Sequence, residues 1–117
     1  MKLEKLFQMK TPDFSKKEMS IKEFILQKKP KNDVQKALVI AYYLENFRNF
    51  SSFNYVDITE GFREARENVP KNVWDKLYKN VRKGHMMEAA EEKDELTAYV
   101  LTNRGERYVT NDFKSEE

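Results

Sequence analysis

Residues 34–47 constrain the fold most, because this segment is apolar on two sides at helical spacing. One stripe consists of Ala37, Leu38, Ala41 and Leu44, and a second, nearly opposite stripe consists of Val39, Ile40, Tyr43 and Phe47. Asn32 or Asp33 can cap the helix at its start. A helix that is apolar on two sides must be covered on two sides. We therefore expect a central helix, covered on one face by other helices and on the other by a helix at residues 21–29 or by a second subunit.

A second helix is expected at residues 71–83. Asn72 is a good N-cap, and Gly84 suits the left-handed position after the last turn. Val73, Leu77 and Val81 recur every four positions and form a one-sided apolar stripe. The helix holds five Lys or Arg residues and one Asp, a local charge of +4, whereas the whole chain carries only +2. Its exposed face is therefore expected to be strongly cationic.

A β-hairpin is expected directly after the basic helix. It would pair residues 85–90 with residues 96–102 around an acidic turn at residues 91–95. Residues 88–95 hold five acids and one Lys, so the hairpin and the preceding helix have opposite charge.

Helix-capping and helix-breaking residues indicate where the remaining elements begin and end. Ser20 and Glu23 form a capping box before a short extra helix at residues 21–29. A short strand is expected at residues 52–54, Asn54 caps the next helix, and Thr102 caps the last. The expected order is helix, helix, short strand, helix, helix, strand, strand, helix. These elements divide the chain into three parts. We expect an N-terminal tail at residues 1–19, a domain at residues 20–110, and a polar, frayed C-terminal tail at residues 111–117.

This order resembles the winged helix-turn-helix superfamily over residues 33–110. The residues that carry the resemblance are the basic helix 71–83, its exit Lys83-Gly84-His85-Met86, and the strand end Tyr99-Val100-Leu101-Thr102 followed by Asn103-Arg104-Gly105. The resemblance implies a mainly helical α+β fold: a winged helix-turn-helix with an extra N-terminal helix and a two- or three-stranded antiparallel wing sheet. Members of the superfamily mostly bind duplex DNA, often as dimers, and many have become protein-interaction modules. The resemblance therefore implies a DNA-binding transcriptional regulator that binds duplex DNA and forms a homodimer.

Six side chains of the basic helix are the candidate DNA-binding residues. Lys71, Lys79, Arg82 and Lys83 could neutralise phosphates, and Asn72, Lys76 and Lys79 could reach base edges in the major groove. The alternative is that the Lys-rich face is merely solvated.

The acidic turn opposes the DNA interpretation. Glu91, Glu92, Asp94 and Glu95 stand where a DNA-binding wing usually carries Arg or Lys, and phosphate would repel them. Two other functions therefore stay open. One is a protein–protein adaptor that uses the acidic wing and the basic helix. The other is binding of single-stranded nucleic acid or RNA, with bases stacked on Trp74 and Tyr78, although core packing is the favoured role for both rings.

Several classes of function find no support in the sequence. The chain has no cysteine, so it has no disulfide and no thiolate site. Its three glycines are not clustered into a phosphate loop, and His85, the only histidine, has no matching nucleophile. The acidic turn lacks the spacing of a calcium loop. We expect no enzymatic activity and neither a cofactor nor a metal. No apolar run approaches the roughly 20 residues of a transmembrane helix, and no signal peptide is evident, so a cytoplasmic protein without a membrane partner is expected.

Overall fold

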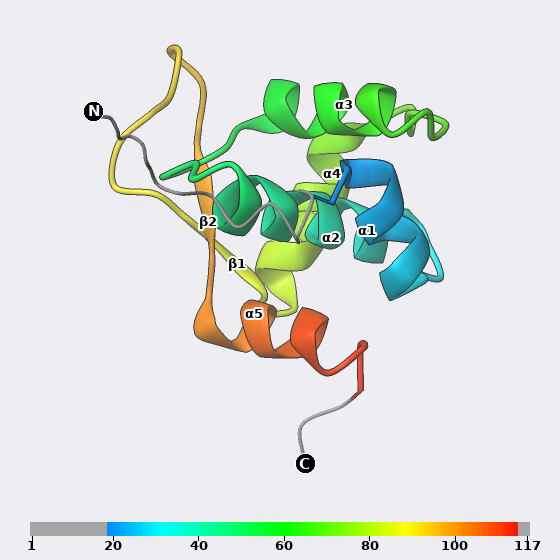
Figure 1. Ribbon diagram of the computed structural model, residues 1–117. Helices are drawn as coiled ribbons and strands as arrows, with labels where there is room; N and C mark the ends of the chain where they lie inside the picture. Colours follow the sequence, from blue (N-terminus) through cyan, green and yellow to red (C-terminus); the bar gives the residue numbers. More distant parts are fainter. Residues whose placement is uncertain (1–18, 115–117) are drawn as a thin grey trace, which may run out of the picture.

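Helix α2, Asp33–Phe47, lies at the centre of the computed structural model, which describes residues 19–114 (Figure 1). The side-chain oxygen of Asn32 accepts a hydrogen bond from the backbone N–H of Gln35 and starts the helix. Residues 37–41 are completely buried, and α2 contacts each of the other helices and strand β2. The described residues form a mainly helical α+β fold with five helices and a two-stranded antiparallel sheet, in the order predicted.

Helix α1, Ile21–Lys28, covers the second apolar stripe of α2. The predicted capping box is present, since the side chains of Ser20 and Glu23 each accept from the other's backbone N–H. The ring of Phe24 stacks on Tyr42 at 5.5 Å and contacts Phe47 at 5.2 Å between ring centroids. Both faces of α2 are therefore covered within one chain. This cover removes the reason for which a second subunit was predicted.

Helices α3, Tyr55–Glu64, and α4, Val73–Arg82, pack on α2 and on each other. Asn54 and Asp57 form a capping box at the start of α3, and Asn72 caps α4 as predicted. Gly61 allows α3 to approach α2 closely: a Cβ at this position would lie 2.4 Å from Cγ2 of Ile40.

Strands β1, Met86–Glu88, and β2, Tyr99–Leu101, form the predicted hairpin, with Met87 opposite Val100. Phe53 adds a bridge to Tyr99 through backbone N···O distances of 3.0 and 2.7 Å, so the strand predicted at residues 52–54 is one residue long. Both hairpin strands are shorter than predicted. The ladder leaves regular geometry beyond Ala89 and Ala98, and Asp94 and Glu95 turn the chain with positive φ values of 54° and 65°.

Helix α5, Asn103–Thr110, closes the fold beneath the hairpin (Figure 1). The hydroxyl of Thr102 donates to the backbone oxygen of Gly84 at 2.6 Å and accepts from the N–H of Gly105 at 2.9 Å. A Cβ on Gly105 would lie 2.1 Å from the backbone oxygen of His85. The sequence Leu101-Thr102-x-x-Gly105 therefore has a local structural role. It holds the start of α5 against the residues that follow α4.

Two side chains of the C-terminal segment contact the domain. The ring of Phe113 packs edge-on against Tyr108 at 5.4 Å, and Asp112 pairs with Lys28 at 3.2 Å. Phe113 and Asp112 therefore contact the domain, although Asn111, Asp112 and Lys114 are exposed, and the C-terminal tail predicted at residues 111–117 stays a prediction. The predicted N-terminal tail, apart from Met19, and residues 115–117 lie outside the described residues. Among residues 19–114, no helix combines the length and the apolar character needed to cross a bilayer.

An ion-pair cluster joins three helical segments around Glu67. Its carboxylate accepts from Lys22 of α1 at 2.6 Å and from Lys36 of α2 at 2.9 Å, while Glu67 itself follows α3. Hydrogen bonds from Lys22 and then Lys36 hold the pKa of Glu67 below its ordinary value of 4.5. The Glu67 side chain is only 16% exposed, which limits screening by solvent.

We expect Glu67→Gln to lower the free energy of unfolding by about 1 kcal/mol at neutral pH, because two ammonium groups lose their carboxylate. A depressed folded-state pKa contributes stability that is present above the ordinary value and is lost as pH falls through the folded-state value. The deficit should therefore shrink in acid, as measured by urea unfolding across a pH series. Glu60→Gln is the control: Glu60 pairs with Arg63, but both side chains are 62% exposed, so little change is expected. Equal losses in the two variants would refute a special role for Glu67.

Candidate nucleic-acid interface

The orientation of α4 is set by the residues that it buries. Val73, Leu77 and Asn80 face the core, and Leu77 is completely buried. The opposite face is open to solvent and begins at the first turn, where Lys71 and Asn72 are both exposed. The predicted cationic face is therefore accessible along the helix.

Three of the six candidate DNA-binding residues are engaged within the helix itself. The side-chain oxygen of Asn72 accepts from the backbone N–H of Asp75 at 3.1 Å, as a cap. The Asp75 carboxylate lies 3.1 Å from the ammonium of Lys79 and 3.4 Å from that of Lys76. Hydrogen bonds from Lys79 and then Lys76 lower the pKa of Asp75. Lys76 is further restricted, since its side chain is only 22% exposed. One acid thus holds the two lysines that were predicted to reach base edges.

The other three candidates, Lys71, Arg82 and Lys83, are exposed and clear of carboxylates. Within residues 19–114, none of them takes part in an ion pair. Their charges therefore face solvent without local compensation. These are the side chains that are best placed to meet a polyanion.

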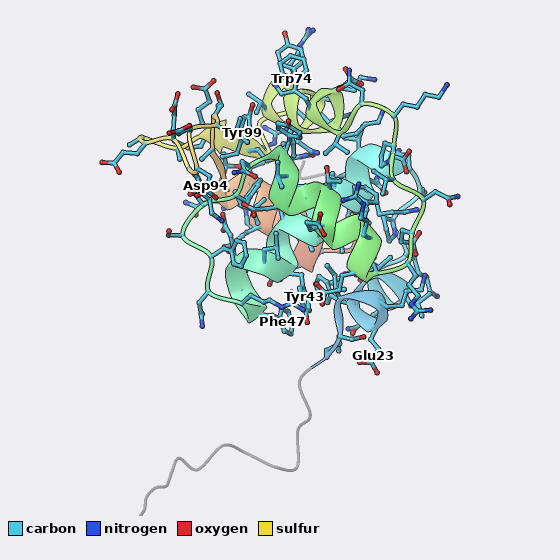
Figure 2. All side chains as sticks on the ribbon, turned by 90° about the horizontal axis from the view of Figure 1, so that it is seen from above. Glu23, Tyr43, Phe47, Trp74, Asp94 and Tyr99 are labelled. Carbon is cyan, nitrogen blue, oxygen red and sulfur yellow. The ribbon has the colours of Figure 1, made fainter. Side chains whose placement is uncertain are left out.

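An aromatic pair runs beside these cations. Trp74 is 50% exposed and Tyr78 is 43% exposed, and their rings stack with centroids 5.3 Å apart. The guanidinium of Arg82 lies 5.9 Å from the ring centre of Tyr78. Figure 2 shows the Trp74 side chain at the outside of the molecule. The prediction that Trp74 and Tyr78 pack in the core was wrong. Val73 and Leu77 face the core, and this rotation of the helix leaves both rings on an exposed side.

The aromatic edge of α4 borders the hairpin. A pocket of about 180 Å³ lies between Tyr55, Trp74, Leu96, Thr97 and Tyr99. Burial raises the pKa of Tyr99, and a side-chain hydrogen bond with Trp74 lowers that pKa by a smaller amount. α4 thus has one edge that is aromatic, toward the hairpin, and another that is cationic, formed by Lys79 and Lys83.

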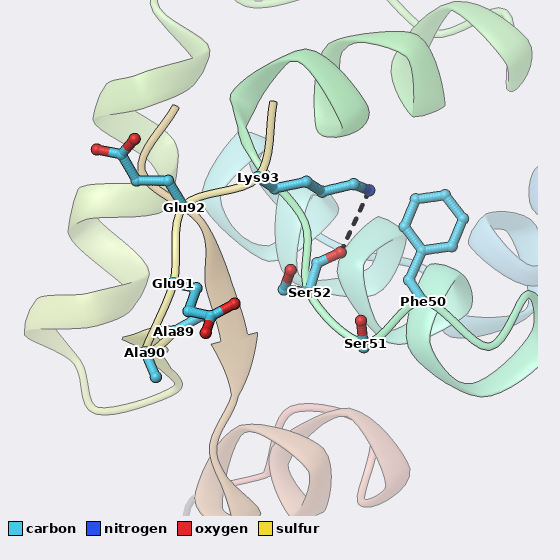
Figure 3. A pocket seen from close by; sticks show the side chains of 8 residues that line it. All are labelled: Phe50, Ser51, Ser52, Ala89, Ala90, Glu91, Glu92 and Lys93. Atoms are coloured by element: carbon cyan, nitrogen blue, oxygen red, sulfur yellow. Dashed lines mark hydrogen bonds between the residues drawn. The ribbon is translucent and has the colours of Figure 1, made fainter. Parts of the chain in front are cut away.

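The acidic turn is anchored through its only cation, Lys93. The ammonium of Lys93 lies 2.8 Å from the carboxylate of Asp57, 3.4 Å from the backbone oxygen of Ser52 and 4.2 Å from the ring centre of Phe50. Asn54 also donates to the backbone oxygen of Lys93 at 3.1 Å. Figure 3 shows Lys93 reaching toward Ser52 and Phe50, beside an open pocket of about 580 Å³.

The four carboxylates of the turn remain on the surface. Glu91, Glu92, Asp94 and Glu95 are all exposed, and Figure 2 labels Asp94 beside the hairpin loop. Since Lys93 is engaged by Asp57, it does not offset them. The contrast in charge between α4 and the hairpin that the sequence predicts is therefore present on the folded surface.

Asn80 is the residue at this site that sequence reasoning missed. It is 1% exposed and lies three residues after Leu77, whereas Val81, at the predicted stripe position, is only half-buried. No local signal in the sequence marks it, because the apolar stripe with a spacing of four runs through Val81 instead. Within residues 19–114, no group of three or more His, Asp or Glu side chains is arranged to hold a metal ion. Comparisons with protein-family models, curated proteins and solved structures found no match to this chain.

Proposed function

We propose that this protein is a winged-helix DNA-binding protein, acting as a transcriptional regulator, that binds duplex DNA through the exposed face of α4. The observation that carries the proposal is the set of exposed cations Lys71, Arg82 and Lys83, which have no ion-pair partner among residues 19–114 and lie on or beside α4. Lys79 joins them when Asp75 releases it to a phosphate. A short helix of this kind fits the width of the major groove.

The order of elements supports the same proposal. Two helices, α3 and α4, are followed by an antiparallel hairpin, and Phe53, just before α3, forms a short bridge to Tyr99 of the hairpin. In this mode of binding the acidic turn must lie away from the phosphates, because its four exposed carboxylates would be repelled. DNA contact would then rest on α4, without the help of the hairpin tip.

Reversing two of the uncompensated charges tests the site. We expect Arg82→Glu with Lys83→Glu to abolish binding to a random duplex at low salt, or to lower the log–log salt slope by about 2, since each phosphate contact contributes roughly 0.9. The measurement is fluorescence anisotropy at several salt concentrations. Lys29→Glu with Lys114→Glu makes the same change in net charge at exposed positions outside α4. Equal losses in both pairs would show a nonspecific charge effect, and unchanged binding in the first pair would place the site elsewhere.

Removing the negative charge of the hairpin turn should strengthen the binding of duplex DNA. The variant replaces Glu91, Glu92 and Glu95 with Gln and Asp94 with Asn. Less repulsion is expected at every salt concentration, and the gain should be largest at low salt, where screening is weakest. Lys93 is kept so that the anchor to Asp57 survives. Weaker binding in this variant would contradict the proposed orientation, because the carboxylates would then be in favourable contact.

A second candidate function is binding of single-stranded nucleic acid, and the exposed Trp74–Tyr78 stack favours it. Stacking of a base on an aromatic ring contributes about 1–3 kcal/mol and needs no particular sequence. Arg82 beside Tyr78 would add a cation next to the stacked base. This function uses the aromatic edge of α4, whereas the duplex proposal uses its cations.

The only tryptophan of the chain, Trp74, separates the two candidates. If single strands stack on α4, oligothymidine should quench the tryptophan emission, and Tyr78→Ala should weaken binding by about tenfold. If duplex DNA is the ligand, Tyr78→Ala should change its affinity little. Leu26→Ala, at an exposed apolar side chain of α1 that lies outside this aromatic edge, is the control. Binding of neither nucleic acid at low salt would sink both candidates and favour the protein–protein adaptor.

A further inference from the structure

Three aromatic side chains from three different elements line the pocket at the aromatic edge of α4. Its volume is about 180 Å³, and its lining consists of Tyr55 from α3, Trp74 from α4, and Leu96, Thr97 and Tyr99 from the hairpin. Tyr55 and Trp74 are 43% and 50% exposed, so a ligand can reach both, whereas the buried Tyr99 forms the inner wall. Pockets for drug-sized ligands usually measure about 300–1,000 Å³. This pocket is therefore sized for a single head group or side chain.

Neighbours that lie outside the pocket hold its aromatic walls in place. The ring of Trp74 stacks on Tyr78 with centroids 5.3 Å apart, and the ring of Tyr99 stacks on Phe53 at 6.4 Å. A side-chain hydrogen bond joins Trp74 to Tyr99, and Figure 2 labels these two side chains in the same region of the molecule. Since neither Tyr78 nor Phe53 lines the pocket, they brace its rings without filling it.

The surroundings of the pocket are negative. No Lys or Arg lines it, and the exposed residues Asp94 and Glu95 directly precede Leu96 in the chain. Glu88 also acts on the pocket wall, because burial and then the carboxylate of Glu88 raise the pKa of Tyr99. In the part of the chain that the structure describes, none of these three acids forms an ion pair. The electrostatic field at this pocket therefore favours a cation.

The lining also selects the kind of cation. Aromatic rings attract cations, and quaternary ammonium groups are commonly recognised by several rings together. No carboxylate lines the pocket, so the N–H donors of a primary ammonium would lose water without gaining a charged acceptor. A quaternary ammonium has no N–H group to satisfy, and its methyl groups match an aromatic wall.

We propose that this pocket binds the trimethylammonium group of an organic cation, carried either by a free small molecule or by a trimethylated lysine side chain. The cation would lie against Tyr55 and Trp74, with Tyr99 as the inner wall, and the acids of the hairpin would attract it over a longer range. This site is independent of the duplex-DNA proposal, because none of the cations of α4 lines it. Single-stranded nucleic acid would compete with the cation for Trp74.

Two ligands of the same shape and different charge test the proposal on the full chain. Choline carries a trimethylammonium group, and 3,3-dimethyl-1-butanol has a neutral carbon in place of the nitrogen. In an NMR titration, choline should shift the indole N–H signal of Trp74, the only tryptophan, saturably in the millimolar range. It should also bind at least about fivefold more tightly than the alcohol. Equal affinities would overturn the preference for charge, and no saturable shift with choline would overturn the site. A shift with oligothymidine and none with choline would assign Trp74 to a nucleobase instead.

A matched pair of substitutions at Tyr55 tests the aromatic wall. Tyr55→Leu keeps an apolar side chain but removes the ring, so it should weaken choline binding severalfold. Tyr55→Phe keeps the ring and should bind choline as the parent protein does. Tyr55 is half-exposed at the first position of α3, so neither change disturbs the core. Equal losses in the two variants, or full retention in both, would overturn the role of this ring in binding the cation.

Neutralising the hairpin turn distinguishes this site from the DNA surface. The variant with Glu91, Glu92 and Glu95 replaced by Gln and Asp94 by Asn should bind choline more weakly at low salt, while its affinity for the neutral alcohol stays the same. The same variant is expected to bind duplex DNA more tightly, so the two proposals predict changes of opposite sign and fail independently. Unchanged choline binding would overturn the contribution of the acids.

A peptide with one trimethyllysine, compared with the same peptide carrying unmodified lysine, identifies the source of the cation. Tighter binding of the methylated peptide than of choline supports the pocket and assigns it to a modified protein. Weaker binding than that of choline supports the pocket and assigns it to a small molecule. Equal affinity for the methylated and the unmodified peptide would overturn the preference for a quaternary ammonium group.

Discussion

The burial of both apolar stripes of α2 is the constraint on which the rest of the structure depends. A helix with two apolar stripes cannot leave either stripe in water, so each other helix has to cover part of it. α1 takes the stripe that includes Phe47, while α3, α4 and α5 cover the remainder. α4 can leave its polar face in solvent because its apolar stripe is narrow and is buried against α2 and its neighbours.

The helices could be predicted from sequence because their starts are encoded locally. Ser20, Asn54, Asn72 and Thr102 each accept a hydrogen bond from a backbone N–H three residues ahead, so the signal lies within one turn. The exposure of Trp74 and the burial of Asn80 could not be predicted in the same way. Both depend on how α4 is rotated against α2, which residues far apart in the chain decide. The hairpin was recognised, but its strand lengths depend on the fold-back of the turn onto the domain.

The charges of α4 are divided between two settings. Lys71, Arg82 and Lys83 are exposed and have no ion pair among residues 19–114, whereas Asp75 holds Lys76 and Lys79. A polyanion would meet the first set directly, but it would have to displace the Asp75 carboxylate from the second.

Asp57 has two partners that belong to different parts of the fold. Its carboxylate accepts from the backbone N–H of Asn54 within the α3 cap, and the same oxygen lies 2.8 Å from the ammonium of Lys93 in the hairpin turn. The tip of the hairpin is thus tied mechanically to the first turn of α3. A bound molecule that displaced Lys93 would remove one partner of the Asp57 carboxylate that caps α3, so the acidic loop is coupled to the domain and is not a free appendage.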